Sequence, residues 1–222
     1  MKKVVFMLLS VIVTLSFFGC ETTMEKRMEN ISELRDEVLV GGDEKITVTL
    51  NSGFRENPFV IDGSSSLERT DFSVITVEGD FSGEEELGYT LYLGETTYEG
   101  KLLKHPFKNS YSVEIAVRSQ KKASITLSGV NFANNYELNS VKTEETISAK
   151  EALEIAEERL KRSVKSVTAD GKLNAEVYLR LLKNPISAEE GYYWYVAYAP
   201  EKYVVYAVLI HSQTREIVAV RE

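Results

Sequence analysis

The sequence predicts a mainly β protein with an α+β part: an antiparallel β-sandwich over residues 45–140, then a module of one helix and an antiparallel sheet over residues 146–222. Apolar and polar residues alternate along short runs up to Tyr136, and a capped-helix pattern with four further strand-like runs follows. Charge separates the two parts. From Thr146 onward 11 basic and 11 acidic residues balance, whereas residues 20–145 carry ten excess negative charges.

The first part contains about seven short runs with strand periodicity, separated by turn signals such as Asn51-Ser52-Gly53 and Ser128-Gly129. One sheet would leave an apolar face in water, so we expect a second sheet to cover it. The arrangement resembles an immunoglobulin-like sandwich by class only, since it lacks the cysteine pair and core tryptophan of antibody domains. Residues 131–145 are polar and are expected to form a connector.

The second part opens with Ser148-Ala149-Lys150-Glu151, which has the spacing of a helix capping box. Apolar residues then recur on one side of the expected helix, which should end near Ser163. Strand-like runs follow at residues 173–182, 192–199, 203–211 and 216–220. A helix followed by such a meander predicts a two-layer α+β arrangement.

The first 19 residues have the features of a signal peptide: Lys2 and Lys3, then an apolar or hydroxyl run that is too short to span a bilayer. Gly19-Cys20 follows this run and resembles the lipobox of bacterial lipoproteins, although Phe17 and Phe18 replace the leucine and small residue common there. The resemblance implies cleavage before Cys20, a lipid on its sulfur, and attachment to the extracytoplasmic face of the cell membrane. The alternative for this single cysteine is a buried, inert thiol.

Residues 20–44 are predicted to form a lipidated stalk between the anchor and the first domain. Met24, Met28, Ile31, Leu34 and Val38 are spaced three or four apart, which indicates an amphipathic helix.

Two stretches of the second part, ISAKEALEIAEERL (residues 147–160) and YVVYAVLIHSQTREIV (residues 203–218), resemble PepSY-type domains of exported bacterial proteins. In this chain His211 stands where that family usually has aspartate, and Arg215 where it has glycine. The resemblance implies a module that binds or inhibits peptidases.

Few residues suggest catalysis or a cofactor. His105 and His211 are expected in turns, and Glu84-Glu85-Glu86 is expected to be a solvated loop rather than a calcium site. The chain has neither a Gly-x-Ser-x-Gly turn nor a phosphate-binding glycine loop. Its net charge of −8 argues against nucleic-acid binding. We therefore expect no catalytic residue, metal site or cofactor.

The most informative cluster is aromatic. Alternation along a strand places Tyr192, Trp194, Val196 and Tyr198 on one face and Tyr193, Tyr195 and Ala197 on the other. The expected helix can cover only one of these faces. Either the aromatic side chains form core, or the uncovered face binds a peptide, a glycan or a protein. The candidate binding residues are Tyr193, Trp194, Tyr195, Tyr198, Tyr203 and Tyr206.

Together these features predict a membrane-anchored extracytoplasmic lipoprotein that binds a protein or peptide without catalysis. The alternatives are a cell-envelope hydrolase, which requires a cleft with converging carboxylates or a triad, and a structural spacer with no ligand.

Overall fold

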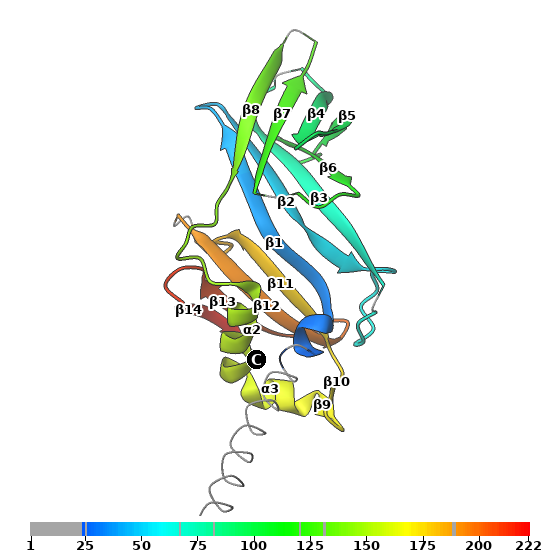
Figure 1. The fold of residues 1–222 in the computed structure, drawn as a ribbon, viewed down its shortest axis with the longest axis vertical. Coiled ribbons are helices and arrows are strands. Elements are labelled where there is room, and N and C mark those ends of the chain that lie inside the picture. The colour runs from blue at the N-terminus through cyan, green and yellow to red at the C-terminus, as the bar shows by residue number, and fades with distance from the viewer. Residues whose placement is uncertain are drawn as a thin grey trace, which may run out of the picture.

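The structure is a computed structural model, and it describes residues 24, 26–66, 68–81, 83–119, 121–130, 132–187 and 190–222. Twelve strands form a single sheet in the order β14-β13-β12-β11-β1-β2-β3-β6-β5-β4-β7-β8, and a further pairing joins β8 back to β1. Figure 1 shows an elongated molecule, with strands β4, β5, β7 and β8 at one end and helices α2 and α3 at the other.

Eight of these strands close into an antiparallel barrel, in which every neighbouring pair is antiparallel. They are β1 (Ile31–Gly42), β2 (Ile46–Glu56), β3 (Arg69–Gly79), β4 (Glu86–Leu93), β5 (Thr96–Lys104), β6 (Ser110–Ile115), β7 (Lys122–Ser128) and β8 (Ala133–Ser140). The predicted β-sandwich is therefore wrong. One sheet curls until its first and last strands pair, so no second sheet is needed to cover the apolar face.

The barrel closes over a short seam between β1 and β8. The paired residues are Leu39 with Ser140 and Val40 with Asn139. Gly41 extends the close approach, because a Cβ atom there would lie 2.1 Å from the carbonyl oxygen of Glu137. Only glycine lets the two strands come this near.

Strand β1 belongs to both halves of the molecule. Its first residues pair in parallel with β11 (Glu176–Lys183), and its last residues pair with β8, while β2 follows it along the other edge. A break in the β1–β2 register between Arg35 and Glu37 marks the change from one half to the other. Such an irregularity re-aims the side chains that follow it.

The second half contains α2 (Ala149–Arg159), α3 (Lys161–Ser166), a small hairpin of β9 (Thr168–Ala169) and β10 (Lys172–Leu173), and the meander β11, β12 (Tyr192–Glu201), β13 (Val204–His211) and β14 (Ile217–Arg221). Ser148 caps α2 as its sequence predicts: its hydroxyl accepts from the Glu151 amide, and the Glu151 carboxylate accepts from the Ser148 amide. This half is not a separate module, because its sheet continues through β1 into the barrel. That continuity corrects the predicted succession of a sandwich and an independent α+β unit.

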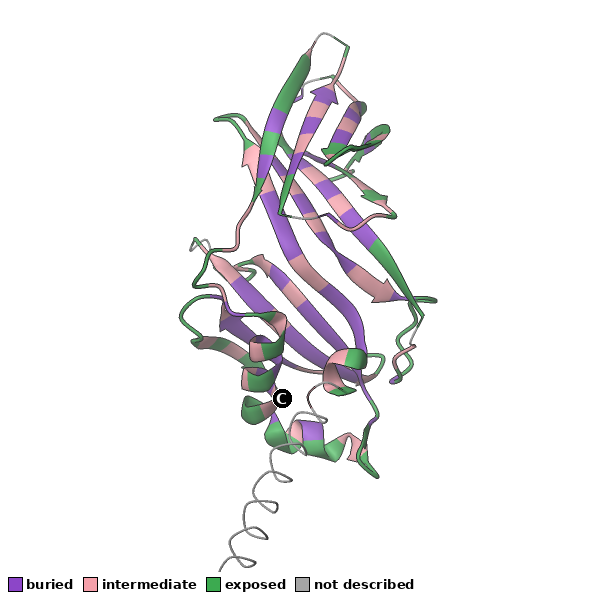
Figure 2. Ribbon diagram, in the orientation of Figure 1, coloured by how far each residue is buried: buried purple, intermediate pink, exposed green. Residues whose placement is uncertain are grey.

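Each half has its own apolar core. One core fills the barrel, and the other lies between α2 and one face of β1 and β11–β13. Buried positions alternate with others along β4 and β7, whereas they form longer runs along β11 and β12 (Figure 2). Alternation is typical of strands with one face in water, and the longer runs show that both faces of β11 and β12 are covered.

Two further expectations fail in the same region. The segment predicted as a helical stalk is helical only as far as Glu29, and Ile31–Gly42 is strand β1. The predicted polar connector contains β8, in which Tyr136 and Leu138 are buried between polar neighbours. The predicted signal peptide and Cys20 lie outside the described residues.

Candidate functional site

The aromatic strand β12 contributes to both faces of the second half. Trp194 and Tyr198 lie in the core under α2, and the Trp194 indole donates a hydrogen bond to the carbonyl oxygen of Ile147 at 3.0 Å. We call this side of the sheet the helix face. Tyr193 and Tyr195 point to the opposite side, where Tyr193 is buried with its ring against His211.

The other two candidate tyrosines lie apart from this strand face. Tyr203 occupies the β12–β13 turn with a positive φ of 83°, is 84% exposed, and has the Lys202 ammonium near its ring. Tyr206 packs against the core of the helix face. The six aromatic residues therefore do not form one platform, and of those pointing away from α2 only Tyr195 is partly exposed in the sheet.

The opposite side of the sheet carries a group of residues that sequence reasoning missed. We call it the arginine face and define it by Glu33 and Arg35 on β1, Arg55 on β2, Phe72 on β3, and Tyr178 and Arg180 on β11. Strand register places them in two adjacent rows: one runs through Phe72, Gly53, Arg35, Arg180 and Tyr195, and the other through Arg55, Glu33 and Tyr178.

The buried carboxylate of Glu33 pairs with two of the three arginines, Arg35 and Arg180. Glu33 is 1% exposed and accepts from Arg35 Nε at 2.8 Å and from the Nε of Arg180. The Arg35 and Arg180 side chains remain 27% and 32% exposed. Pairing with two cations makes the buried carboxylate tolerable.

The third arginine completes a stack over one aromatic ring. Arg55 forms a bidentate ion pair with Glu114, and its guanidinium carbon lies 4.8 Å from the centre of the Phe72 ring. Arg35 lies 5.2 Å from the same ring. Gly53 lies between Arg35 and Phe72 in the row, and a Cβ there would lie 1.7 Å from the Leu34 carbonyl oxygen, so glycine allows the close approach of β2 to β1 at this point.

A loop between β2 and β3 borders the arginine face. Buried Glu176 holds it by accepting from the backbone amides of Asp62, at 2.6 Å, and Gly63, at 3.2 Å. Glu176 also accepts from the Tyr178 hydroxyl, and burial together with this carboxylate raises the pKa of Tyr178. The loop places Phe59, which is 41% exposed, edge-on to the Tyr178 ring.

A second buried carboxylate, Glu56, anchors the far end of this loop by accepting from the Ser66 amide at 2.6 Å. Burial raises the pKa of Glu56, and the negative charges of Glu176 and Asp62 raise it further. Glu56 is 2% exposed and Glu176 is fully buried. Because a catalytic acid or base must reach its substrate, the buried carboxylates of Glu56 and Glu176 are assigned to holding the loop and not to acid–base catalysis.

The remaining candidates are structural in the described residues. His105 Nδ1 accepts from the Phe107 amide, and His211 Nδ1 accepts from the amides of Gln213 and Thr214, so both rings cap turns. Within the described ranges, no three histidine, cysteine or acidic side chains gather as metal ligands. Glu84 accepts from the Val130 amide, and Glu86 pairs with Lys101.

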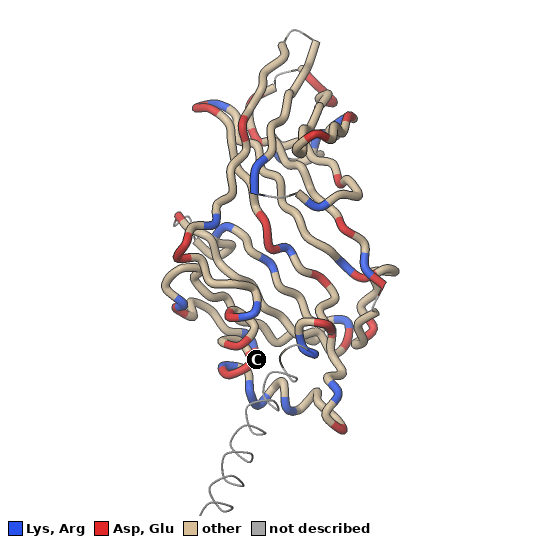
Figure 3. Tube along the Cα trace, in the orientation of Figure 1, with Lys and Arg blue, Asp and Glu red and all other residues tan. Residues whose placement is uncertain are grey.

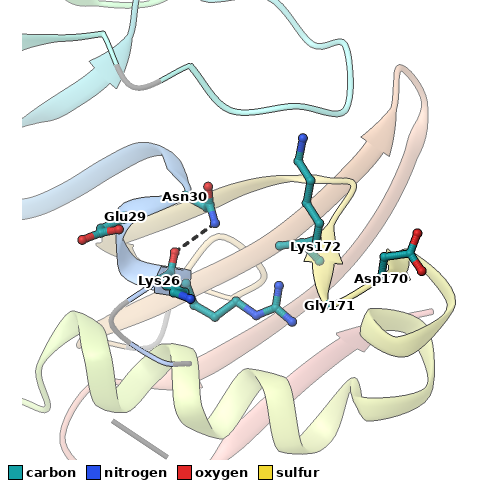
Figure 4. A pocket seen from close by; sticks show the side chains of 8 residues that line it. Lys26, Glu29, Asn30, Asp170, Gly171 and Lys172 are labelled. Atoms are coloured by element: carbon teal, nitrogen blue, oxygen red, sulfur yellow. Dashed lines mark hydrogen bonds between the residues drawn. The ribbon is translucent and has the colours of Figure 1, made fainter. Parts of the chain in front are cut away.

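A hollow beside the first helical turn also offers little specificity. Figure 4 shows Lys26, Glu29, Asp170 and Lys172 around it, and the Asn30 amide folded back onto the Lys26 carbonyl at 2.9 Å. Side chains of both charge signs line the hollow, so it favours neither a cation nor an anion.

The arginine face is suited to binding. In Figure 3 charged positions of both signs lie together in the middle of the molecule, where β1, β2 and β11 run side by side. Guanidinium groups held by a buried acid and stacked on a ring present fixed donors to a planar anion. In the sequence each of these arginines follows an apolar residue on a strand, at Leu34-Arg35, Phe54-Arg55 and Leu179-Arg180, but Val220-Arg221 on β14 has the same pattern, so the pattern does not single out the site.

Comparison of the chain with protein-family models, with curated proteins and with solved structures gave no match. No helix among the described residues is long and apolar enough to cross a membrane.

Proposed function

We propose that this chain is an exported, lipid-anchored protein at the extracytoplasmic face of the cell membrane, and that it binds a protein or peptide without acting on it. The observation that carries the binding role is the arginine face, where three partly exposed arginine side chains lie beside aromatic rings. Arginine and aromatic residues are the types that dominate the energy of protein interfaces.

The anchoring part of the proposal rests on the leader and on Cys20. Two acyl chains hold a folded domain stably, because each buried methylene contributes about 0.8 kcal/mol. Mass spectrometry of the protein from its membranes should find the peptide before Cys20 removed and lipid on the cysteine. A Cys20→Ser variant should leave the membrane fraction. An unmodified sulfur in the natural protein refutes the anchoring.

Binding is tested with a library of synthetic peptides and purified full-length protein. The protein should retain a subset of peptides, leave them uncleaved by mass spectrometry, and lose them when Arg55 and Arg180 are changed together to glutamine, a variant in which buried Glu33 keeps Arg35 as its partner. Cleaved peptides support a hydrolase instead. Retention of none supports a spacer. The resemblance of residues 147–218 to PepSY domains makes a peptidase the first protein partner to test.

A further inference from the structure

We infer that the ligand of the arginine face is an acidic peptide whose Asp or Glu side chains pair with Arg180, Arg35 and Arg55. This deepens the proposed function and rests on it. The basis is the juxtaposition of three guanidinium groups, one buried carboxylate shared by Arg35 and Arg180, and the partly exposed rings of Phe59 in the β2–β3 loop and Tyr195 on β12.

Arg180 is the residue with the most unused binding capacity. Only its Nε donates within the described residues, to Glu33, so the Nη1 and Nη2 fork has no protein acceptor there. Arg35 uses Nε and Nη2 on the same carboxylate and leaves Nη1 open. Such a fork matches the two oxygens of a carboxylate.

The charges of this face differ in exposure. The three arginine side chains are 27–32% exposed, whereas Glu33 beside them and Glu176 beside Tyr178 are buried. Glu114, which pairs with Arg55, is 43% exposed. The chain as a whole carries −8 and repels polyphosphates and long polyanions at a distance, whereas a short peptide can bring a few carboxylates to the open guanidinium groups.

The spacing of the face also favours a peptide. Arg35 and Arg180 are register partners on adjacent strands, which lie about 4.8 Å apart. Tyr195 is the register partner of Arg180, and Phe59 lies against Tyr178 and Arg55; both residues are partly exposed. Alternating charged and aromatic contacts suit a segment in which acidic and apolar residues are interleaved.

The test uses a short fluorescent peptide in which glutamate alternates with leucine. Its binding to the full chain is measured by fluorescence anisotropy. Matched peptides carry glutamine or lysine in place of glutamate. We expect binding of the glutamate peptide alone, with an affinity that falls as salt is added. Competition by excess polyphosphate at equal charge should be weaker than competition by unlabelled glutamate peptide.

Two variants locate the site without unfolding the protein. Arg180→Gln leaves Glu33 with its Arg35 partner, and Arg55→Gln leaves Glu114 exposed to water; each should weaken binding about tenfold. The matched control is Arg118→Gln, because Arg118 is 34% exposed but pairs with Asp36 and lies over Phe54, on the helix face. It should bind as the wild type does.

The outcomes separate the two proposals. If the glutamine peptide binds as tightly as the glutamate peptide, and Arg180→Gln weakens both, the preference for acidic peptides is overturned and the binding role of the face stands. Stronger competition by polyphosphate also overturns it, in favour of a different polyanion. Loss of binding to the same extent in Arg118→Gln shows a general charge effect and refutes the site. If no peptide of the three binds, the acidic inference fails, and the library experiment decides the binding role separately.

Discussion

Tyr198 shows how a buried residue can pack well and still carry a cost. Its ring is fully buried under α2, and its hydroxyl has no hydrogen-bond partner in the described part of the chain. Burial raises the pKa of this hydroxyl well above its usual value, so the group stays neutral. An unsatisfied buried hydroxyl is unfavourable relative to its exposure in water.

Tyr198→Phe should therefore keep or increase stability, by up to about 1 kcal/mol, in urea unfolding. Trp194→Phe, in the same core, should lose about 1–3 kcal/mol because it removes the hydrogen bond to Ile147 together with buried volume. A clear loss of stability in Tyr198→Phe would show that the hydroxyl has a partner.

Glu56 should make stability depend on pH in a defined direction. Because burial raises its pKa above the usual 4.5, the folded state holds a proton that the unfolded state has already released. Stability from this group is fully present below pH 4.5 and is lost as pH rises through the raised pKa.

The measurement is the unfolding free energy of Glu56→Gln minus that of the wild type across this range. The difference should increase with pH and then level off above the raised pKa. A difference that decreases with pH would mean that the folded protein stabilises the charged carboxylate.

The helix start is the element-scale feature that sequence reasoning predicted in most detail. Ser148→Ala removes the cap of α2 and should cost about 1 kcal/mol in urea unfolding. Arg215→Gln removes only the exposed ion pair with Glu151 and should change stability by much less. Equal effects of the two substitutions would show that the cap contributes nothing beyond that pair.

The β1–β8 seam depends on the absence of a side chain at Gly41. Gly41→Ala places a Cβ against the Glu137 carbonyl, which is backbone and cannot rotate away, so the seam must separate. Amide exchange should accelerate along β8 and the end of β1, while β12 and β13 keep their protection. Uniform acceleration across both halves would mean that the seam is not a local unit.

Element type was predictable where a single pattern dominated. The alternation of apolar and polar residues predicted β2 to β7, and the spacing of the capping box predicted the start of α2. β1 was mistaken for a helix because it is covered on both faces over part of its length, so strand alternation disappears and the chance spacing of Met28, Ile31, Leu34 and Val38 remains. Glu33 is polar in sequence yet buried, because its partner Arg180 comes from a strand 147 residues away.

Closure and the site were not predictable for a related reason. The alternation of apolar and polar residues shows which face of a strand is apolar. Strands of a sandwich and strands of a barrel have the same alternation, so it does not distinguish the two folds. The deciding contact is a two-residue pairing between β1 and β8. Likewise, each apolar-arginine pair is unremarkable alone, and only the register of β1, β2 and β11 brings the arginines onto one face.

At the scale of the whole molecule, the shared strand makes the barrel dependent on residues outside the predicted domain of 45–140. A fragment of those residues lacks β1, and therefore loses Leu39 from the core and exposes the edges of β2 and β8. It should be unfolded or aggregated by circular dichroism and light scattering, whereas residues 26–145 should fold. A folded, monomeric 45–140 fragment would show that closure is dispensable.

The position of β1 has a mechanical consequence. Tension entering from the proposed anchor at Cys20 would reach β1 before any other strand. The hydrogen bonds between strands run across the strand direction. A pull along β1 therefore loads its hydrogen bonds to β2, β11 and β8 in shear and does not break them one at a time. The same strand that carries Glu33 and Arg35 would thus be the part of the protein best able to bear load between a membrane and a bound partner.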